Sequence, residues 1–241
     1  MTDAFGRAIR DHHRGERTEP LLHRDGSETT EHPIDSYYFT EFDPDADDGW
    51  LASWVQGPLV DLGAGTGRHA LYFQQQFETV AIEASPALVE TMRDRGVEDA
   101  RTGDMFDLRS QFERDRFRSA LSNGTQLGLA GSMRGLSEFL GDLAYVTTPD
   151  ATAVLDSYDP NHPATTELIG YRHDPTPGLA HRVMFFEYEG ESTPVLQIRL
   201  FSPDRLREAA VGTGWEVVEV VRGEAGDAYH YRAALDRTGG E

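Results

Sequence analysis

The residues best suited to chemistry lie in one glycine-rich run, Val60-Asp61-Leu62-Gly63-Ala64-Gly65-Thr66-Gly67. Glycine has no side chain and accepts positive φ, so glycine at every second position lets the backbone approach a ligand closely. Apolar residues precede the run, and an amphipathic segment with Ala70, Phe73 and Phe77 on one face follows it. The pattern predicts a buried strand, a tight loop and a helix, with a nucleotide-like ligand bound at the loop.

The next three predicted strands lie at 79–82, 100–102 and 118–122. A polar residue ends or follows each of them: Glu83, Asp104 (followed by Met105) and Asn123. The carboxyl ends of parallel strands meet at one edge, which is where open α/β sheets bind ligands. Taken singly, Glu83 is typical of a solvated strand end, and Asp104 and Asn123 are typical of turns. Their order along successive strands favours a single site.

Alternating strand and helix patterns position these residues. Ser85-Pro86 begins a helix that Gly96 ends, and apolar spacing predicts another helix over about 133–146. Residues 151–155 form a continuous apolar strand, of the kind that a parallel sheet buries on both faces. This βαβαβ order predicts an α/β fold with a parallel sheet and right-handed crossovers.

Two segments lie outside this alternation. Residues 1–57 are expected to form an irregular N-terminal extension, with a polar helix over 3–17 and a turn at 24–26. Its aromatic cluster at 37–42 serves either as a hydrophobic staple or as a lid over a ligand. Residues 58–241 are expected to form the main domain. Within it, about 160–201 is β-rich, with a hairpin of strands at 181–188 and 195–201 that predicts a cap.

Over residues 58–235 the chain resembles class I S-adenosylmethionine-dependent methyltransferases, whose first motif corresponds to residues 60–67. The resemblance implies a three-layer, Rossmann-like sheet, mostly parallel with an antiparallel last strand, and S-adenosyl-L-methionine as the cofactor. It implies that Gly63, Ala64 and Gly65 lie under the methionine portion of the cofactor. Asp61 would orient the ammonium group of that portion, through the loop or through a water.

The resemblance also implies residues for the rest of the cofactor. Glu83, with Ala84 beside it, would hold the ribose hydroxyls, and Asp104 would accept from the adenine amino group. Met105 would pack on the adenine and offer its backbone N–H, and backbone groups near Asn123 would contact the cofactor's amino group. These assignments suit the chemistry, because a vicinal diol matches a carboxylate and a cationic cofactor matches an acidic pocket.

Two other functions stay open. A NAD-dependent oxidoreductase also uses a glycine loop, but that loop reads G-x-G-x-x-G, and Asp61 would repel a pyrophosphate. A non-catalytic, regulatory protein that binds S-adenosylmethionine would need the same pocket and no general base.

The residues that could face a methyl acceptor are Tyr38, Asp156, Tyr158 and His181. Asp156 and Tyr158 close the predicted fifth strand or form a bend there, and His181 is either a base or an exposed strand-end histidine. None is decisive, because methyl transfer depends mainly on aligning the nucleophile. The Asn/Asp-Pro-Pro-Tyr/Phe motif of enzymes that methylate bases is absent after the fourth strand, so we expect a small-molecule acceptor.

Composition limits the partners and the location that we expect. The chain has 241 residues and no cysteine, which excludes disulfides and cysteine metal sites. No His/Asp/Glu cluster has metal-ligand spacing, no apolar run is long enough for a membrane span, and no signal-peptide pattern is present, so a cytoplasmic protein is expected. With 42 acidic against 22 basic residues the formal net charge is −20, which disfavours nucleic-acid partners. The oligomeric state is open.

The acidic residues also predict adaptation to salt, because all 22 basic residues are arginine and a charge of −20 repels itself in dilute buffer. At molar salt the Debye length falls to ~3 Å and this repulsion largely disappears. We therefore expect a higher melting temperature in molar potassium chloride than in low salt, by about 2–4 °C for each kcal/mol gained. Thermal melts at the two salt concentrations check this, and equal midpoints would contradict a halophilic character.

Overall fold

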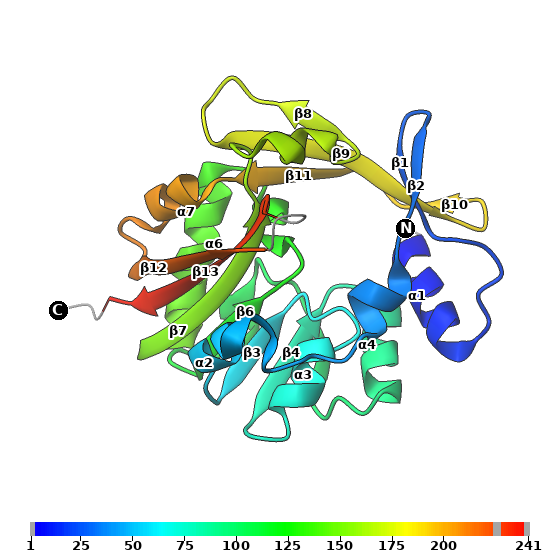
Figure 1. Ribbon diagram of the computed structural model, residues 1–241. Coiled ribbons are helices and arrows are strands. Elements are labelled where there is room, and N and C mark those ends of the chain that lie inside the picture. Colours follow the sequence, from blue (N-terminus) through cyan, green and yellow to red (C-terminus); the bar gives the residue numbers. More distant parts are fainter. Residues whose placement is uncertain (1–2, 224–227, 239–241) are drawn as a thin grey trace.

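Two β-sheets and the helices around them make up residues 3–223 and 228–238, the part of the chain that the computed structural model describes (Figure 1). The side chains of residues 47 and 48 are not described. The predicted α/β class is confirmed. No helix in the described part is long and apolar enough to cross a membrane.

The main sheet has seven strands in the order β12-β13-β7-β6-β3-β4-β5. Their bounds are β3 Leu59–Leu62, β4 Thr79–Glu83, β5 Ala100–Thr102, β6 Phe117–Ser122, β7 Thr147–Tyr158, β12 Trp215–Arg222 and β13 His230–Arg237. Strands β3 to β7 pair in parallel, whereas the last strand of the chain, β13, runs antiparallel to both β7 and β12. The carboxyl ends of β3, β4, β5 and β6 therefore meet at one edge, as the sequence predicts.

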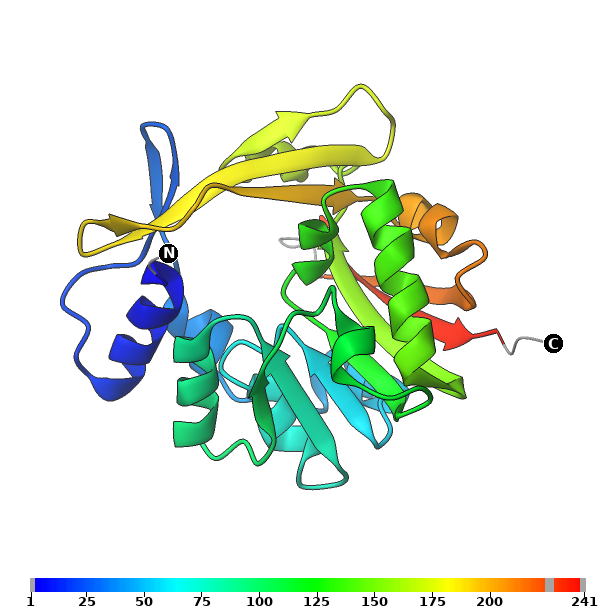
Figure 2. The same ribbon diagram turned by 180° about the vertical axis from the view of Figure 1, so that it is seen from behind.

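Helices cover both faces of this sheet and complete three layers (Figures 1 and 2). On one face lie α2 (Trp50–Trp54), α3 (Arg68–Phe73) and α4 (Pro86–Asp94), which pack on inward residues such as Leu59 and Ala81. On the other lie α5 (Leu108–Gln111), α6 (Met133–Val146) and α7 (Pro203–Ala210), which enclose the largest apolar cluster. Shorter turns of helix span Asp35–Phe39, Ala46–Gly49, Gln126–Ala130 and Pro163–Glu167.

The second sheet, which we call the cap sheet, lies over one edge of the main sheet in both views (Figures 1 and 2). Its strands are β1 Leu22–Asp25, β2 Glu28–Glu31, β8 Tyr171–His173, β9 Leu179–Tyr188, β10 Glu191–Ser192 and β11 Leu196–Phe201. The long strand β9 pairs antiparallel with β1, β8, β10 and β11. The predicted hairpin of β9 and β11 is confirmed.

The N-terminal segment is more ordered than the irregular extension expected from its sequence, although the helix expected over 3–17 and the turn expected at 24–26 are confirmed. It begins with α1 (Ala4–Arg14), and its hairpin β1–β2 joins the cap sheet, so the cap contains strands from two distant segments. Long-range pairing of β1 with β9 leaves no local signal in a polar stretch. The boundary drawn at residue 57, and the division into extension and main domain, stay predictions.

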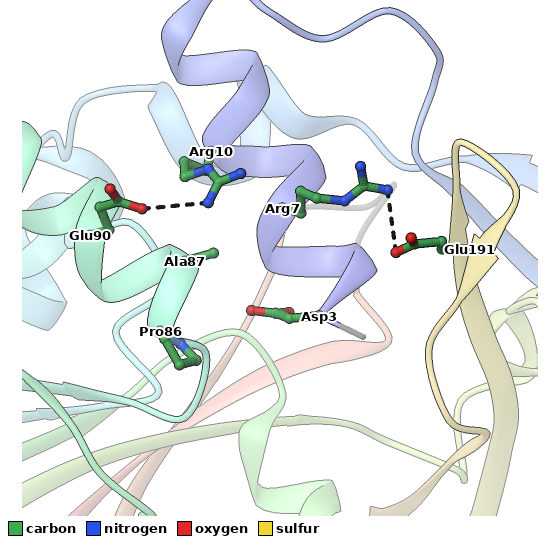
Figure 3. A pocket seen from close by; sticks show the side chains of 7 residues that line it. All are labelled: Asp3, Arg7, Arg10, Pro86, Ala87, Glu90 and Glu191. Carbon is green, nitrogen blue, oxygen red and sulfur yellow. Dashed lines mark hydrogen bonds and ion pairs between the residues drawn. The ribbon is translucent and has the colours of Figure 1, made fainter. Parts of the chain in front are cut away.

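Helix α1 connects the cap to the main domain. Figure 3 shows it beside a shallow surface pocket, with Arg10 directed at Glu90 of α4 and Arg7 at Glu191 of β10. The two ion-pair distances are each 3.5 Å, so carboxylates already neutralise both cations. Beneath these pairs, the buried side chains of Ile9, Leu88 and Tyr188 belong to one apolar cluster.

Strand β7 is longer than predicted. The apolar run ends at Leu155, but the strand continues through Tyr158 because β13 pairs with it as far as His230 opposite Tyr158. Polar residues at 156–157 are therefore inside the strand and buried, and do not form a bend.

Replacing Ile9 by alanine tests how much the packing of α1 between the cap sheet and the main domain stabilises the fold. Ile9 is fully buried between α4 and β9, so Ile9→Ala should lower the free energy of unfolding by about 2–5 kcal/mol. Urea unfolding measures this. Val211→Ala truncates a side chain that is 81% exposed and should change the free energy by less than about 0.5 kcal/mol. An Ile9→Ala effect as small as that of the control would contradict the connection.

Candidate functional site

The glycine loop follows β3 at the carboxyl edge of the main sheet. Gly63, Gly65 and Gly67 all have positive φ, of 65°, 59° and 79°. A Cβ on Gly67 would also lie 2.5 Å from Val97 Cγ2. Glycine is therefore required at position 67 both by the positive φ and by the lack of room for a side chain. The backbone amides of Ala64, Gly65 and Gly67 each donate within the protein, to Ile82, Glu83 and Ala64, which fixes the loop at the start of α3.

Glu83, the last residue of β4, connects this loop to the next helix. Its Oε2 accepts from the Gly65 N–H and its Oε1 from the Ser85 N–H, each at 3.1 Å. Desolvation raises the pKa of Glu83, against the lowering effect of the N–H groups of Ser85, Gly65 and Ala84. Carboxylate oxygens each have two acceptor positions, so this side chain can still accept from hydroxyl groups of a ligand.

Asp61 lies beneath the loop and is only 2% exposed. Burial raises its pKa to about 7, opposed by a hydrogen bond from the Ala70 backbone and increased by the nearby Glu83 carboxyl. Among the described residues, its Oδ2 has no hydrogen-bond partner. An enclosed carboxylate oxygen without a partner is a feature that a cationic ligand would satisfy.

The other residues expected to bind a cofactor follow the next strands. Asp104 is exposed and accepts from the Phe106 N–H at 2.9 Å, Met105 is buried within the apolar core, and Asn123 lies half-buried after β6. Ala84 is exposed between Glu83 and α4. The structure places all of them along the same edge, and their roles toward a ligand stay predictions.

Tyr38 lies against the glycine loop. Its ring carbons would be 3.5 Å from a Cβ on Gly65, and its carbonyl accepts from Thr66 Oγ1 and from Arg95 Nη1. The same ring belongs to the apolar cluster beneath the cap sheet. The aromatic segment thus packs on the core and also covers the glycine loop. This arrangement is compatible both with a hydrophobic staple and with a lid over a ligand.

Asp156 organises a second loop at this edge and is 1% exposed. Its carboxylate accepts from the backbone N–H of Gly124 at 2.8 Å and of Thr125 at 2.7 Å, and it pairs with His230 Nε2 at 2.8 Å. It therefore positions the segment that begins at Asn123. His230, which was missed from the sequence, lies beside Asp156 because β13 pairs antiparallel with β7, with His230 opposite Tyr158.

Tyr158 and His181 lie in different places. Tyr158 contacts the cluster beneath the cap sheet, and its ring centroid is 5.7 Å from that of His230. His181 belongs to the alternate, outward residues of β9, where it contacts Arg199 and lies 3.5 Å from Asp174. The structure therefore does not bring His181 together with the other candidates.

The inward face of β9 carries residues that the sequence analysis did not single out. Arg182 alternates in phase with Met184, Phe186 and Tyr188, and all four are buried. The sequence could have indicated Arg182, because an arginine among the alternate, apolar positions of a strand is unusual.

His23 and His32 adjoin this face, and a ring–ring distance of 4.5 Å separates them. Burial lowers the pKa of His23 to about 3, with further lowering by His32 and Arg182. Burial also lowers the pKa of His32 to about 4, aided by Arg182. Both imidazoles are therefore neutral near pH 7. They come from the β1–β2 hairpin region, which the sequence gave no reason to place beside β9.

No group of three or more His, Cys, Asp or Glu side chains within 3–223 and 228–238 could hold a metal ion. No protein-family model matches the chain. No curated protein matches it either.

Solved structures do match the fold. An S-adenosylmethionine-dependent methyltransferase from Bacteroides fragilis, in complex with S-adenosyl-L-homocysteine, is 24% identical over 98% of this chain and 94% of that chain, with a TM-score of 0.76. The CcbJ methyltransferase from Streptomyces caelestis is 16% identical over 78% and 92% of the two chains, with a TM-score of 0.60. CalS10, an amino pentose methyltransferase from Micromonospora echinaspora, is 18% identical over 75% and 83%, with a TM-score of 0.52. The chain therefore has the α/β fold of S-adenosylmethionine-dependent methyltransferases.

Asp156→Asn tests the loop-positioning role. An amide is neutral and offers one acceptor oxygen in place of two, so one of the two backbone N–H groups at 124–125 loses its acceptor and the other keeps only a neutral one. We expect a loss of about 2 kcal/mol in the free energy of unfolding and faster hydrogen exchange at these two amides. Asp150→Asn, at an exposed position of the same strand, is the control and should leave that exchange unchanged. Unchanged protection in Asp156→Asn would contradict the role.

Proposed function

We propose that the protein is an S-adenosylmethionine-dependent methyltransferase that acts on a small-molecule acceptor. The observation that carries the proposal is the pair of enclosed carboxylates, Asp61 and Glu83, beneath and beside a glycine loop in a methyltransferase fold. Two acidic groups at this position favour a cationic nucleotide-like ligand. They disfavour the pyrophosphate of NAD, because like charges repel in an enclosed site.

The chain's own residues fit this cofactor. The Asp61 oxygen without a partner would receive an ammonium group, and the Glu83 carboxylate, which the amides of Gly65 and Ser85 orient, would accept from ribose hydroxyls. Asp104, Met105 and Asn123 follow the neighbouring strands and would contact the adenine and the rest of the cofactor. Tyr38 would cover the loop and exclude water.

When bound, the cofactor supplies a methyl group on a positively charged sulfur, which an acceptor displaces in line. The protein's task is then alignment and exclusion of water. The segment at 124–125, which Asp156 holds, would position the acceptor together with Tyr158 of β7 and Arg182 of the cap sheet.

Calorimetric titration of the full chain with S-adenosylmethionine, S-adenosylhomocysteine and NAD in molar salt tests the proposal. We expect binding of both sulfur ligands and none of NAD. Binding of NAD alone would favour an oxidoreductase and exclude the proposal. Methyl incorporation from labelled cofactor into a small-molecule extract separates an enzyme from a regulatory binding protein, and its persistent absence would favour the latter.

Glu83→Gln should weaken S-adenosylhomocysteine binding by about 1–3 kcal/mol, because charge-assisted hydrogen bonds to the diol are lost while the shape is kept. Calorimetry measures the change, and a thermal melt shows that the variant is folded. Glu98→Gln, at an exposed position beyond α4, is the matched control and should bind like the parent protein. Equal affinities in both variants would remove Glu83 from the site.

The raised pKa of Asp61, about 7, predicts that cofactor binding depends on pH. An ammonium group needs the ionised carboxylate, so below pH 7 binding must release a proton and weakens by up to about tenfold per pH unit. Above pH 7 this dependence levels off. Calorimetry in buffers of different ionisation enthalpy measures the released proton. In Asp61→Asn the proton release should vanish, and a release that persists there would assign it to another group.

A further inference from the structure

Arg182 is a buried cation whose charge no carboxylate of the described chain neutralises. It is 7% exposed, and its Nε donates to the Ile169 carbonyl at 3.1 Å. Within the described ranges, no acidic side chain lies at ion-pair distance from its guanidinium, and its two Nη atoms have no hydrogen-bond partner. Burying a charge without a partner costs several kcal/mol, so a fold retains one only where something offsets the cost.

The groups around Arg182 are aromatic and uncharged. Its guanidinium carbon lies 5.8 Å from the centre of the Tyr158 ring, and the hydroxyls of Tyr37 and Tyr229 are near enough to influence its charge. Burial lowers the pKa of the guanidinium, and the same charge helps to keep His23 and His32 neutral. The cation therefore has flat apolar neighbours and no competing anion.

Arg182 also adjoins the proposed site of methyl transfer. Tyr158, which it overlies, contacts His230, and His230 pairs with the Asp156 carboxylate that holds the segment at 124–125. Tyr38, whose ring covers Gly65, packs against the same apolar cluster beneath the cap sheet as Tyr158 does. A molecule held by Arg182 would thus lie between the cap sheet and the glycine loop.

The charge of the chain makes this position selective. The formal net charge is −20, so the surface repels anions, whereas Arg182 presents one positive charge at a position that is only 7% exposed. One guanidinium matches one carboxylate through two parallel hydrogen bonds. A phosphate dianion would leave one buried negative charge unbalanced.

We propose that Arg182 binds the carboxylate of the methyl acceptor, so that the acceptor is a flat, aromatic or unsaturated monocarboxylic acid. The proposal rests on the proposed function. The Tyr158 ring lies next to the guanidinium and packs against the same apolar cluster that contains Phe186, so these two rings would contact the planar part of the acid. The carboxylate, once paired with Arg182, is an anchor that directs another part of the molecule toward the glycine loop.

Calorimetric titrations of the full chain with benzoate, benzamide and phenyl phosphate, in the presence of S-adenosylhomocysteine, test this proposal. Benzoate and benzamide have the same shape and differ in charge. We expect benzoate to bind at least about tenfold more tightly than benzamide, because a charge-assisted pair is lost in the amide. This preference is measured on the unaltered protein and needs no folded variant. Absence of benzoate binding, no preference over benzamide, or a preference for phenyl phosphate would overturn the proposal.

Arg182→Met removes the charge and keeps an apolar side chain of similar reach. It should lower the benzoate affinity by at least about tenfold, abolish the preference over benzamide and leave S-adenosylhomocysteine affinity within about twofold. Arg172→Met, on the neighbouring strand β8 where Arg172 pairs with Asp25 at the surface, is the control and should change neither affinity. Unchanged benzoate affinity in Arg182→Met would overturn the proposal.

Titrating both S-adenosylhomocysteine and benzoate distinguishes failure of the acceptor proposal from failure of the proposed function. If Arg182→Met loses S-adenosylhomocysteine affinity by the same factor as benzoate, Arg182 holds the carboxylate of the cofactor, and the acceptor proposal fails while the proposed function stands. If the parent protein binds neither S-adenosylhomocysteine nor S-adenosylmethionine, the proposed function fails. The preference for benzoate over benzamide, titrated alone, then reports separately on Arg182 as an anion site.

Discussion

The arrangement of the site depends on two carboxylates, half-buried Glu83 and buried Asp156, that accept hydrogen bonds from backbone N–H groups. Glu83 accepts from Gly65 and Ser85, and Asp156 accepts from Gly124 and Thr125. Each carboxylate thereby ties a loop after one strand to the end of a neighbouring strand. Hydrogen bonds to ionised acceptors are about twice as strong as neutral ones, so the loops keep conformations that open solvent would not maintain. These bonds fix the loops that follow β3 and β6 at the carboxyl edge of the sheet.

Two acidic side chains lie beneath and beside the glycine loop, whereas the buried charge on the inward face of the cap sheet is positive, and the proposed chemistry depends on this difference. The acidic pair, Asp61 and Glu83, suits a cationic cofactor. On the inward face of the cap sheet, Arg182 is a buried cation and the neighbouring imidazoles of His23 and His32 are neutral, which suits the acceptor carboxylate that we propose. Opposite charges at these two places would orient an acceptor and a cofactor relative to each other before any bond changes.

Local patterns predicted the main sheet well. The glycine run, the Ser85 cap and the apolar spacing over 133–146 each act within a few residues, and the structure confirms the loop, α4 and α6. Where prediction failed, the deciding contact was distant. β7 continues past Leu155 because β13 pairs with it, and the β1–β2 hairpin is ordered because β9 lies beside it. Neither pairing leaves a pattern in the paired segments themselves.

By itself, the sequence determined the α/β class, the glycine loop and the acidic residues that follow successive strands, because each depends on short-range spacing and on parallel strands sharing an edge. Only the tertiary structure decided which polar residues share an enclosure. It directed His181 outward and Arg182 inward, though they are neighbours, and it brought Asp156 and His230 together from 74 positions apart. The physical reason is that burial and charge pairing depend on what packs against a strand, and that partner comes from elsewhere in the chain.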